Sequence, residues 1–262
     1  TPGDTDAAYG ISLRELCTVL EARGLRHGAR LEALVATLVR IRDRFRAIPA
    51  RYERGRPLIG IQGEIFCRMN EFSNDALIRR LEACGGEAWL SDVSEWVWYC
   101  NNDQERCLRH EGRRFSFAML GAKLRGHIQW ADEAALRAPF AEDFRGYEEP
   151  EEIEEILRAG DRYLPQAGTA GEMVLSAGKV GYFFRKGVDG IIDISPFSCM
   201  NGIVSEALYP RQSQEHAGLP IKNFYFDGTG GDIIHDLEIF LELARTYQRR
   251  KPHPRRYPPC FP

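Results

Sequence analysis

The sequence lacks the short motifs from which an activity is usually read. Its seven cysteines are scattered, and no two of them are separated by only two residues, which excludes a zinc knuckle and gives no framework for secreted disulfides. There is no HExxH pair of histidines and no GxSxG segment, so the signatures of zinc peptidases and serine hydrolases are absent. The segment GEMVLSAGK (residues 171–179) has too many residues between its glycines for a Walker A loop.

Long apolar runs and an excess of charge of one sign are also lacking. The 262 residues have a formal net charge of −3, so nothing in the charge favours nucleic acid or an anionic membrane as a partner. No apolar run approaches the ~20 residues of a membrane span, and the start has no signal-like pattern. We therefore expect a cytoplasmic protein with reduced thiols, with no nucleic acid and no membrane as partner. The chain starts at Thr1 rather than methionine, so an upstream extension stays open.

The N-terminal part of the chain has a helical pattern. The composition is 44% hydrophobic, enough for a substantial core. Residues 11–50 carry two helical repeats, and in the first of them Leu13, Cys17 and Leu20 fall on one face. The pattern predicts an N-terminal helical segment (1–56) with Cys17 in its core, because free cysteine packs as a small hydrophobe.

Two strand–helix–strand units follow. The first has strands at 58–66 and 87–92 with a helix at about 74–84, and the second has strands at 190–197 and 221–227 with a helix at 201–217. Short connections of this kind form right-handed parallel units. Together they predict an α/β fold, a Rossmann-like four-stranded parallel sheet with strand order 2-1-3-4. Thr229 and Asp232 suit the N-cap and first turn of a long closing helix.

The expected Rossmann-like domain consists of 57–92 and 190–251, with a helical insertion at 93–189 and an extended tail at 252–262. A crossover between parallel strands needs only about a dozen residues. The residues of the insertion beyond that length therefore predict a helical subdomain, such as a lid or an interface. Cys100 and Cys107 would share a helix face within it, where a place in the core is the more common role.

The chemistry is expected where the first and third strands end. In this strand order they are central neighbours whose helices leave to opposite faces, and open α/β sheets bind ligands at such a switch point. The candidate residues are Glu64, Cys67, Arg68 and Asn70 on the first loop and Ser198, Cys199 and Asn201 on the second. Cys199 falls at a helix N-terminus, which favours the thiolate that a nucleophile or a soft metal needs. Cys199 could equally well fill the turn, and Cys67 could simply pack after the strand.

A third loop, DGTGGD (residues 227–232), leaves the fourth strand nearby. Its first four residues, Asp227, Gly228, Thr229 and Gly230, form a glycine-rich strand-to-helix turn that could bind an anion. A plain tight turn accounts for the same residues.

Three blocks of the sequence resemble a known family. GEIFCRMNEFSNDALIRRLEACGGEAWLSDVSEWVWY, GVDGIIDISPFSCMNGIVSEAL and PIKNFYFDGTGGDIIHDLEIFLELARTYQ resemble the C-terminal region of CoA-substrate-specific enzyme activases. They are also similar to the D-component family of 2-hydroxyacyl-CoA dehydratases, which includes double-cubane cluster reductases. The resemblance covers about residues 57–250. Cys199 matches the cysteine of a PFxCMPG pattern, with Asn201 in place of its proline.

The resemblance implies Rossmann-like domains that carry cysteine-bound iron–sulfur clusters and receive low-potential electrons from an ATPase activator. Of the cysteines, only Cys199 matches a family cysteine, and it would be a cluster ligand. Cys67 stands where the family has a branched apolar residue, so as a second ligand it would belong to a modified ligand set. Polar groups that would hydrogen-bond to the sulfurs are Glu64, Arg68, Asn70, Ser198 and Asn201. The ATPase motifs are absent from this sequence, so the partner would be the ATPase activator domain or an upstream cysteine-containing segment.

The expected function is therefore an iron–sulfur-binding module of a 2-hydroxyacyl-CoA dehydratase- or activase-like electron-transfer system. Whether the chain is itself an enzyme is left open. One alternative is a cluster-free interaction domain that docks a catalytic partner, and another is an acyl-CoA or nucleotide site at the DGTGGD turn. Two copies could also pair and supply the missing cysteines by symmetry, as a homodimer.

Overall fold

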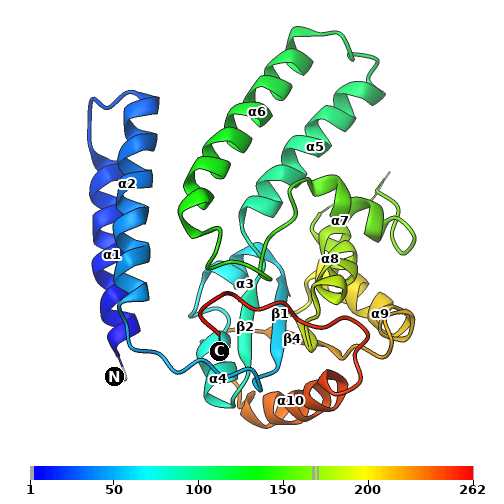
Figure 1. The fold of residues 1–262 in the computed structure, drawn as a ribbon. Coiled ribbons are helices and arrows are strands. Elements are labelled where there is room, and N and C mark those ends of the chain that lie inside the picture. The colour runs from blue at the N-terminus through cyan, green and yellow to red at the C-terminus, as the bar shows by residue number, and fades with distance from the viewer. Residues whose placement is uncertain (1–2, 167–168, 170, 262) are drawn as a thin grey trace. The chain divides into compact units, whose positions relative to one another are not determined.

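The computed structural model describes residues 3–166, 169 and 171–261. Its contacts divide the chain into two compact units (Figure 1). The helical unit comprises the chain up to Glu53, Gln104–Arg145 and the residues from Pro258 onward, and the sheet unit comprises Arg54–Asp103 and Gly146–Tyr257. The residues of the expected insertion are thus shared between both units.

The helical unit contains α1 (Asp4–Glu21), α2 (His27–Arg46), α6 (Phe117–Arg137) and the end of α5 (Ser94–His110). Ala8 and Ser12 of α1 and Thr37 and Ile41 of α2 are buried. The prediction that Cys17 lies in the core is wrong, because it is exposed on the opposite face of α1. Small residues of α1 allow its close approach to α2, and several larger apolar residues of α1, such as Leu13 and Leu20, are exposed.

The sheet unit has four parallel strands in the order β2-β1-β3-β4, as predicted. They are β1 (Leu58–Gly63), β2 (Glu87–Leu90), β3 (Gly190–Pro196) and β4 (Ile221–Phe226). Both central strands, β1 and β3, are almost fully buried, since helices cover the two faces of the sheet (Figure 1). The fold is therefore α/β and Rossmann-like.

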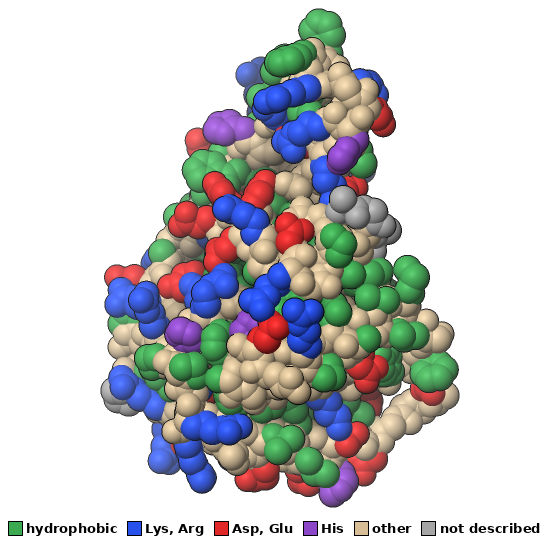
Figure 2. Space-filling view, turned by 90° about the vertical axis from the view of Figure 1, so that its right-hand side faces the viewer, with side chains coloured by type: hydrophobic (Ala, Val, Ile, Leu, Met, Phe, Trp, Pro, Cys, Tyr) green, Lys and Arg blue, Asp and Glu red, His purple; other side chains and the backbone are tan. Residues whose placement is uncertain are grey.

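Two apolar cores flank the sheet. One lies between the sheet and α7 (Ile153–Gly160), α8 (Met173–Lys186) and α9 (Met200–Glu215). The other lies between the sheet and α3 (Ile65–Met69), α4 (Leu77–Ala83) and α10 (Ile234–Gln248). The helix α8 falls inside the expected insertion, yet it packs against β1 and β3 and is the crossover helix that leads into β3. On the side shown in Figure 2, charged side chains of both signs are interspersed over much of the surface.

Three sequence predictions need correction in detail. The first strand ends at Gly63 rather than at Phe66, because the chain turns there into α3. The closing helix begins at Ile234, so Thr229 and Asp232 lie in the loop before it, where Asp232 accepts a hydrogen bond from the amide of Ile234 at 3.1 Å. Cys107 is exposed rather than in the core.

Candidate functional site

The carboxyl ends of β1, β3 and β4 bring three loops to one edge of the sheet. We call this surface the switch edge and define it as residues 63–76, 196–206 and 226–233. The loops are joined by backbone hydrogen bonds, from Glu64 to Ile194 at 2.8 Å and from Phe197 to Phe226 at 2.8 Å. The turn out of β1 requires glycine: Gly63 has φ +114°, and a Cβ on it would lie 2.2 Å from the carbonyl oxygen of Ile194.

Cys199 lies at the N-cap of α9 on the switch edge, as the sequence predicted, and it is half-buried. Its amide donates to the carbonyl of Pro196 at 3.1 Å. Ser198 precedes it with φ +62°, a left-handed conformation that costs free energy for a residue other than glycine. The strained turn therefore fixes the backbone at Cys199 and leaves its side chain without a capping hydrogen bond.

Cys67 lies in α3 and packs in the core formed with α4 and α10. Burial and the nearby Glu64 carboxylate raise the pKa of the Cys67 thiol to about 12. The charge of Cys199 raises the same pKa further, so the two thiols lie within electrostatic range of each other. A buried thiol of this kind stays protonated at neutral pH and is a poor nucleophile.

The side chains of the other predicted residues mostly bond the backbone of these loops, and Glu64 also hydrogen-bonds the Cys67 thiol. Glu64 caps α3 and accepts a hydrogen bond from the amide of Cys67 at 2.9 Å. Asn70 accepts from the amides of Phe72 and Ser73 at 3.0 and 3.1 Å, which closes the loop. Asn201 lies beside Gly171: a Cβ added to Gly171 would be 2.8 Å from the side-chain oxygen of Asn201.

The donor set does not complete an iron–sulfur site. Such clusters use three or four protein ligands, and within 3–166, 169 and 171–261 no group of three or more His, Cys, Asp and Glu side chains could hold a metal ion. On the switch edge, the half-buried thiol of Cys199 and the buried thiol of Cys67 are the cysteines near a possible cluster.

The DGTGGD turn borders a pocket of about 510 Å³. The facing wall is the loop between α3 and α4, with Glu71 and Asp75. Asp227 accepts hydrogen bonds from the amide and hydroxyl of Thr229 at 2.9 and 2.6 Å, and these bonds lower the pKa of Asp227. Glu71 and Asp75 pair with Arg79 and Arg80, and the residues that line the pocket include no Lys or Arg. The lining therefore offers no cationic side chain to an anion.

Large hydrophobic side chains protrude from the switch edge. Phe72 is 86% exposed, and five further residues of the loops are more than half exposed, namely Phe66, Met69, Phe197, Met200 and Ile203. An exposed group of this size is typical of a protein–protein contact.

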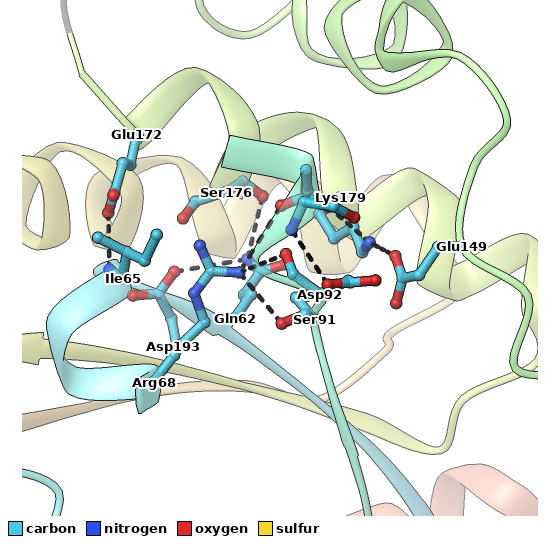
Figure 3. A network of polar contacts seen from close by, with 12 residues as sticks. Gln62, Ile65, Arg68, Ser91, Asp92, Glu149, Glu172, Ser176, Lys179 and Asp193 are labelled. Carbon is cyan, nitrogen blue, oxygen red and sulfur yellow. Dashed lines mark hydrogen bonds and ion pairs between the residues drawn. The ribbon is translucent and has the colours of Figure 1, made fainter. Parts of the chain in front are cut away.

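Sequence reasoning missed a buried polar network beneath this edge (Figure 3). Lys179 of α8 is 0% exposed, and its Nζ bonds Oε2 of Glu95 at 2.6 Å and also the carboxylate of Glu149. Burial lowers the pKa of Lys179, but the two carboxylates outweigh it, so the net shift is upward. Burial also raises the pKa of Glu149. A lysine inside the apolar run MVLSAGKVGYFF was the available signal.

Arg68 belongs to the same network, although the sequence suggested a place beside a sulfur. Its guanidinium is buried and donates to the carbonyls of Ser91 and Asp92 at 3.3 and 3.5 Å, as Figure 3 shows. It also lies 3.9 Å from the carboxylate of Glu95. Arg68 therefore ties α3 to the chain that follows β2.

Two buried acids complete the network. Glu172, at the start of α8, accepts a hydrogen bond from the amide of Ile65 at 3.0 Å, and burial raises the pKa of Glu172 to about 7. Asp193 of β3 accepts hydrogen bonds from Tyr209 and Gln62, and burial raises the pKa of Asp193 as well. These groups sit where an apolar layer is usual, between the sheet and α8.

Comparison of the chain with protein-family models, with curated proteins and with solved structures gives no match. Among the helices described, none is both long and apolar enough to cross a membrane. The case for a function therefore rests on the residues and their geometry.

Proposed function

We propose that this chain is a docking module of a 2-hydroxyacyl-CoA dehydratase- or activase-like electron-transfer system, with the switch edge as its contact surface. The observation that carries the proposal is the set of exposed hydrophobic residues on two loops that flank Cys199, among them Phe72 and Phe197. Burying apolar surface drives association, and these side chains surround a thiol rather than a closed pocket.

A second, more specific function is favoured by the position of Cys199. A half-buried thiol at a helix N-terminus on a contact surface can serve as one ligand of an iron–sulfur cluster whose other cysteines come from a partner. The partner would be the ATPase activator or an upstream cysteine-containing segment of the same system. Cys67, with its raised pKa, is the weaker candidate for a ligand.

The acyl-CoA or nucleotide site at the DGTGGD turn is not part of the proposal. Both ligands are anionic, and the pocket there is lined by Glu71, Asp75 and Asp227. Like charges disfavour their binding.

The test is anaerobic co-purification of this chain with the upstream segment or the activator, followed by measurement of iron and acid-labile sulfide. Cys199→Ala should lose the iron, and Cys260→Ala, an exposed cysteine of the tail, is the matched control. If the partners co-purify and the iron survives Cys199→Ala, the docking proposal stands and the proposal that Cys199 is a cluster ligand is wrong. Failure of the partners to co-purify would remove both.

A further inference from the structure

The helical unit presents a second hydrophobic surface, at the turn between α5 and α6. We call residues 106–128 the hairpin tip. Phe115 and Phe117 there are 97% and 93% exposed, and Leu120, Leu124 and Ile128 are exposed along α6. The spacing of three and four residues places the latter three and Phe117 on one face of the helix, while Met119 and Ala122 face inward and are buried.

The hairpin tip is strongly basic. Residues 106–128 contain six Lys and Arg residues, two His and one acidic residue, Glu111. At the top of Figure 2, where α5 meets α6, hydrophobic side chains protrude with basic ones beside them. On α6 the apolar face has Arg125 along one side and His127 and Lys123 along the other. A partner of this surface must therefore be apolar at its centre and acidic around it.

The switch edge has this character. Its loops carry six acidic residues, which are Glu64, Glu71, Asp75, Glu206, Asp227 and Asp232. Within these three loops the one basic residue is Arg68, which is buried. Arg79 and Arg80, just after the first loop, pair with Glu71 at 3.4 Å and with Asp75 at 2.7 Å. The net negative charge of the edge therefore comes from the remaining four carboxylates. Glu71 and Glu206 are exposed beside Phe72 and Ile203. The two surfaces thus have opposite charge and the same apolar centre.

The areas of the two surfaces also match. Taking ~150–200 Å² for a fully exposed large side chain, the exposed hydrophobic residues of each surface amount to roughly 600 Å². A specific interface buries about 800 Å² on each partner, rim included.

We propose that the switch edge of one copy of this chain binds the hairpin tip of a second copy. The inference rests on the docking role proposed for the switch edge. It places a second copy on the residues that the activator would cover, so the two partners would compete for this surface. Each copy carries both surfaces, so two copies can bind through two equal contacts, each between a switch edge and a hairpin tip, and form a two-fold dimer. If each copy instead binds two different neighbours, a longer assembly forms. The opposite charges speed the encounter of the two copies, and the Phe side chains, which become buried in the contact, stabilise the complex.

The experiment is sedimentation equilibrium of the full chain over a range of micromolar concentrations, at low and high salt. We expect a dimer or larger assembly whose dissociation constant rises with salt. The pair Phe115→Ser with Phe117→Ser, and Phe72→Ser on the other surface, should each weaken association at least about tenfold. Leu243→Ser is the control, since Leu243 is exposed on α10, outside both surfaces. Circular dichroism checks that each variant is folded.

A charge exchange makes the test specific. The variant Arg113→Glu with Arg114→Glu and the variant Glu71→Lys with Glu206→Lys should each fail to associate alone. Mixed together they should associate again, because one contact then pairs the two altered surfaces and the other pairs two unaltered ones. A monomer at every concentration, or association unaffected by the hairpin variants, would overturn the inference. The iron measurement with Cys199→Ala tests the proposed function separately, and neither result decides the other.

Discussion

Lys179 gives the sharpest test of how the sheet unit is stabilised. The change is Lys179→Met, which keeps most of the apolar stem and removes the charge. The wild-type ammonium lies 2.6 Å from Oε2 of Glu95, bonds the carboxylate of Glu149 and sits about 5 Å from the rings of Tyr182 and Phe183. Without it, the carboxylates of Glu95 and Glu149 remain buried, and the guanidinium of Arg68 lies 3.9 Å from Glu95.

Removing one partner of a buried ion pair costs about 3–5 kcal/mol, so we expect Lys179→Met to lower the free energy of unfolding by that amount at neutral pH. The control is Lys186→Met on the same helix. Lys186 is partly exposed and pairs with Glu148 at 2.7 Å, a contact expected to contribute less than about 1 kcal/mol. Urea unfolding followed by circular dichroism measures both.

The cost should also depend on pH. In the variant, Glu149 has lost its counter-charge, so its pKa, already raised by burial, rises further. The folded variant then binds a proton that the unfolded chain releases above about pH 4.3. Stability of the variant therefore increases as pH falls toward 5, and the gap to wild type narrows. A loss no larger than that of Lys186→Met, or a gap that does not change with pH, would refute the reasoning.

Two further predictions concern single residues. The pKa of Glu172 is raised to about 7 in the folded chain, so wild-type stability should fall as pH rises from about 4.3 through 7. Glu172→Gln keeps an acceptor for the Ile65 amide and should remove about 1–3 kcal/mol of that dependence. If urea unfolding shows the same change in stability between pH 5 and pH 8 for both proteins, the prediction is wrong. Gly63→Ala should destabilise by more than about 3 kcal/mol, because a Cβ would lie 2.2 Å from the Ile194 oxygen at φ +114°. Gly126→Ala in α6 meets nothing within 4 Å and should stabilise by about 0.5–1 kcal/mol, so equal effects of the two substitutions on thermal unfolding would rule out the steric cause.

The sheet could be predicted because its signals are local. Each strand–helix–strand unit carries an apolar run, a turn and a helical repeat in order, and the handedness of the crossover then limits the strand order. The position of Cys199 at the start of α9 followed from the same logic. Helix α8 was assigned to the insertion because its contacts with β1 depend on residues more than a hundred positions away, although β3 follows it directly in the sequence.

The environment of each side chain was harder to predict. Cys17 fits an apolar helical face, but which face is buried depends on the small residues through which α1 approaches α2. Arg68 was placed beside a sulfur because its neighbours in sequence are on the switch edge, whereas its guanidinium turns under the edge toward Ser91. Burial of Lys179 requires two carboxylates from separate segments, and no single stretch of sequence shows that coincidence.

The strand β4 has a consequence for how the chain is made. It is an edge strand of the sheet, and its sequence IKNFYF has Lys222 as its single charge. Such a segment is prone to pair with copies of itself whenever the chain is incomplete. Lys222 acts against this as a gatekeeper on the strand, and in the folded chain it bonds Asp236 at 2.8 Å. Replacing Lys222 would therefore cause aggregation of the incomplete chain during synthesis before it measurably lowers the stability of the folded protein.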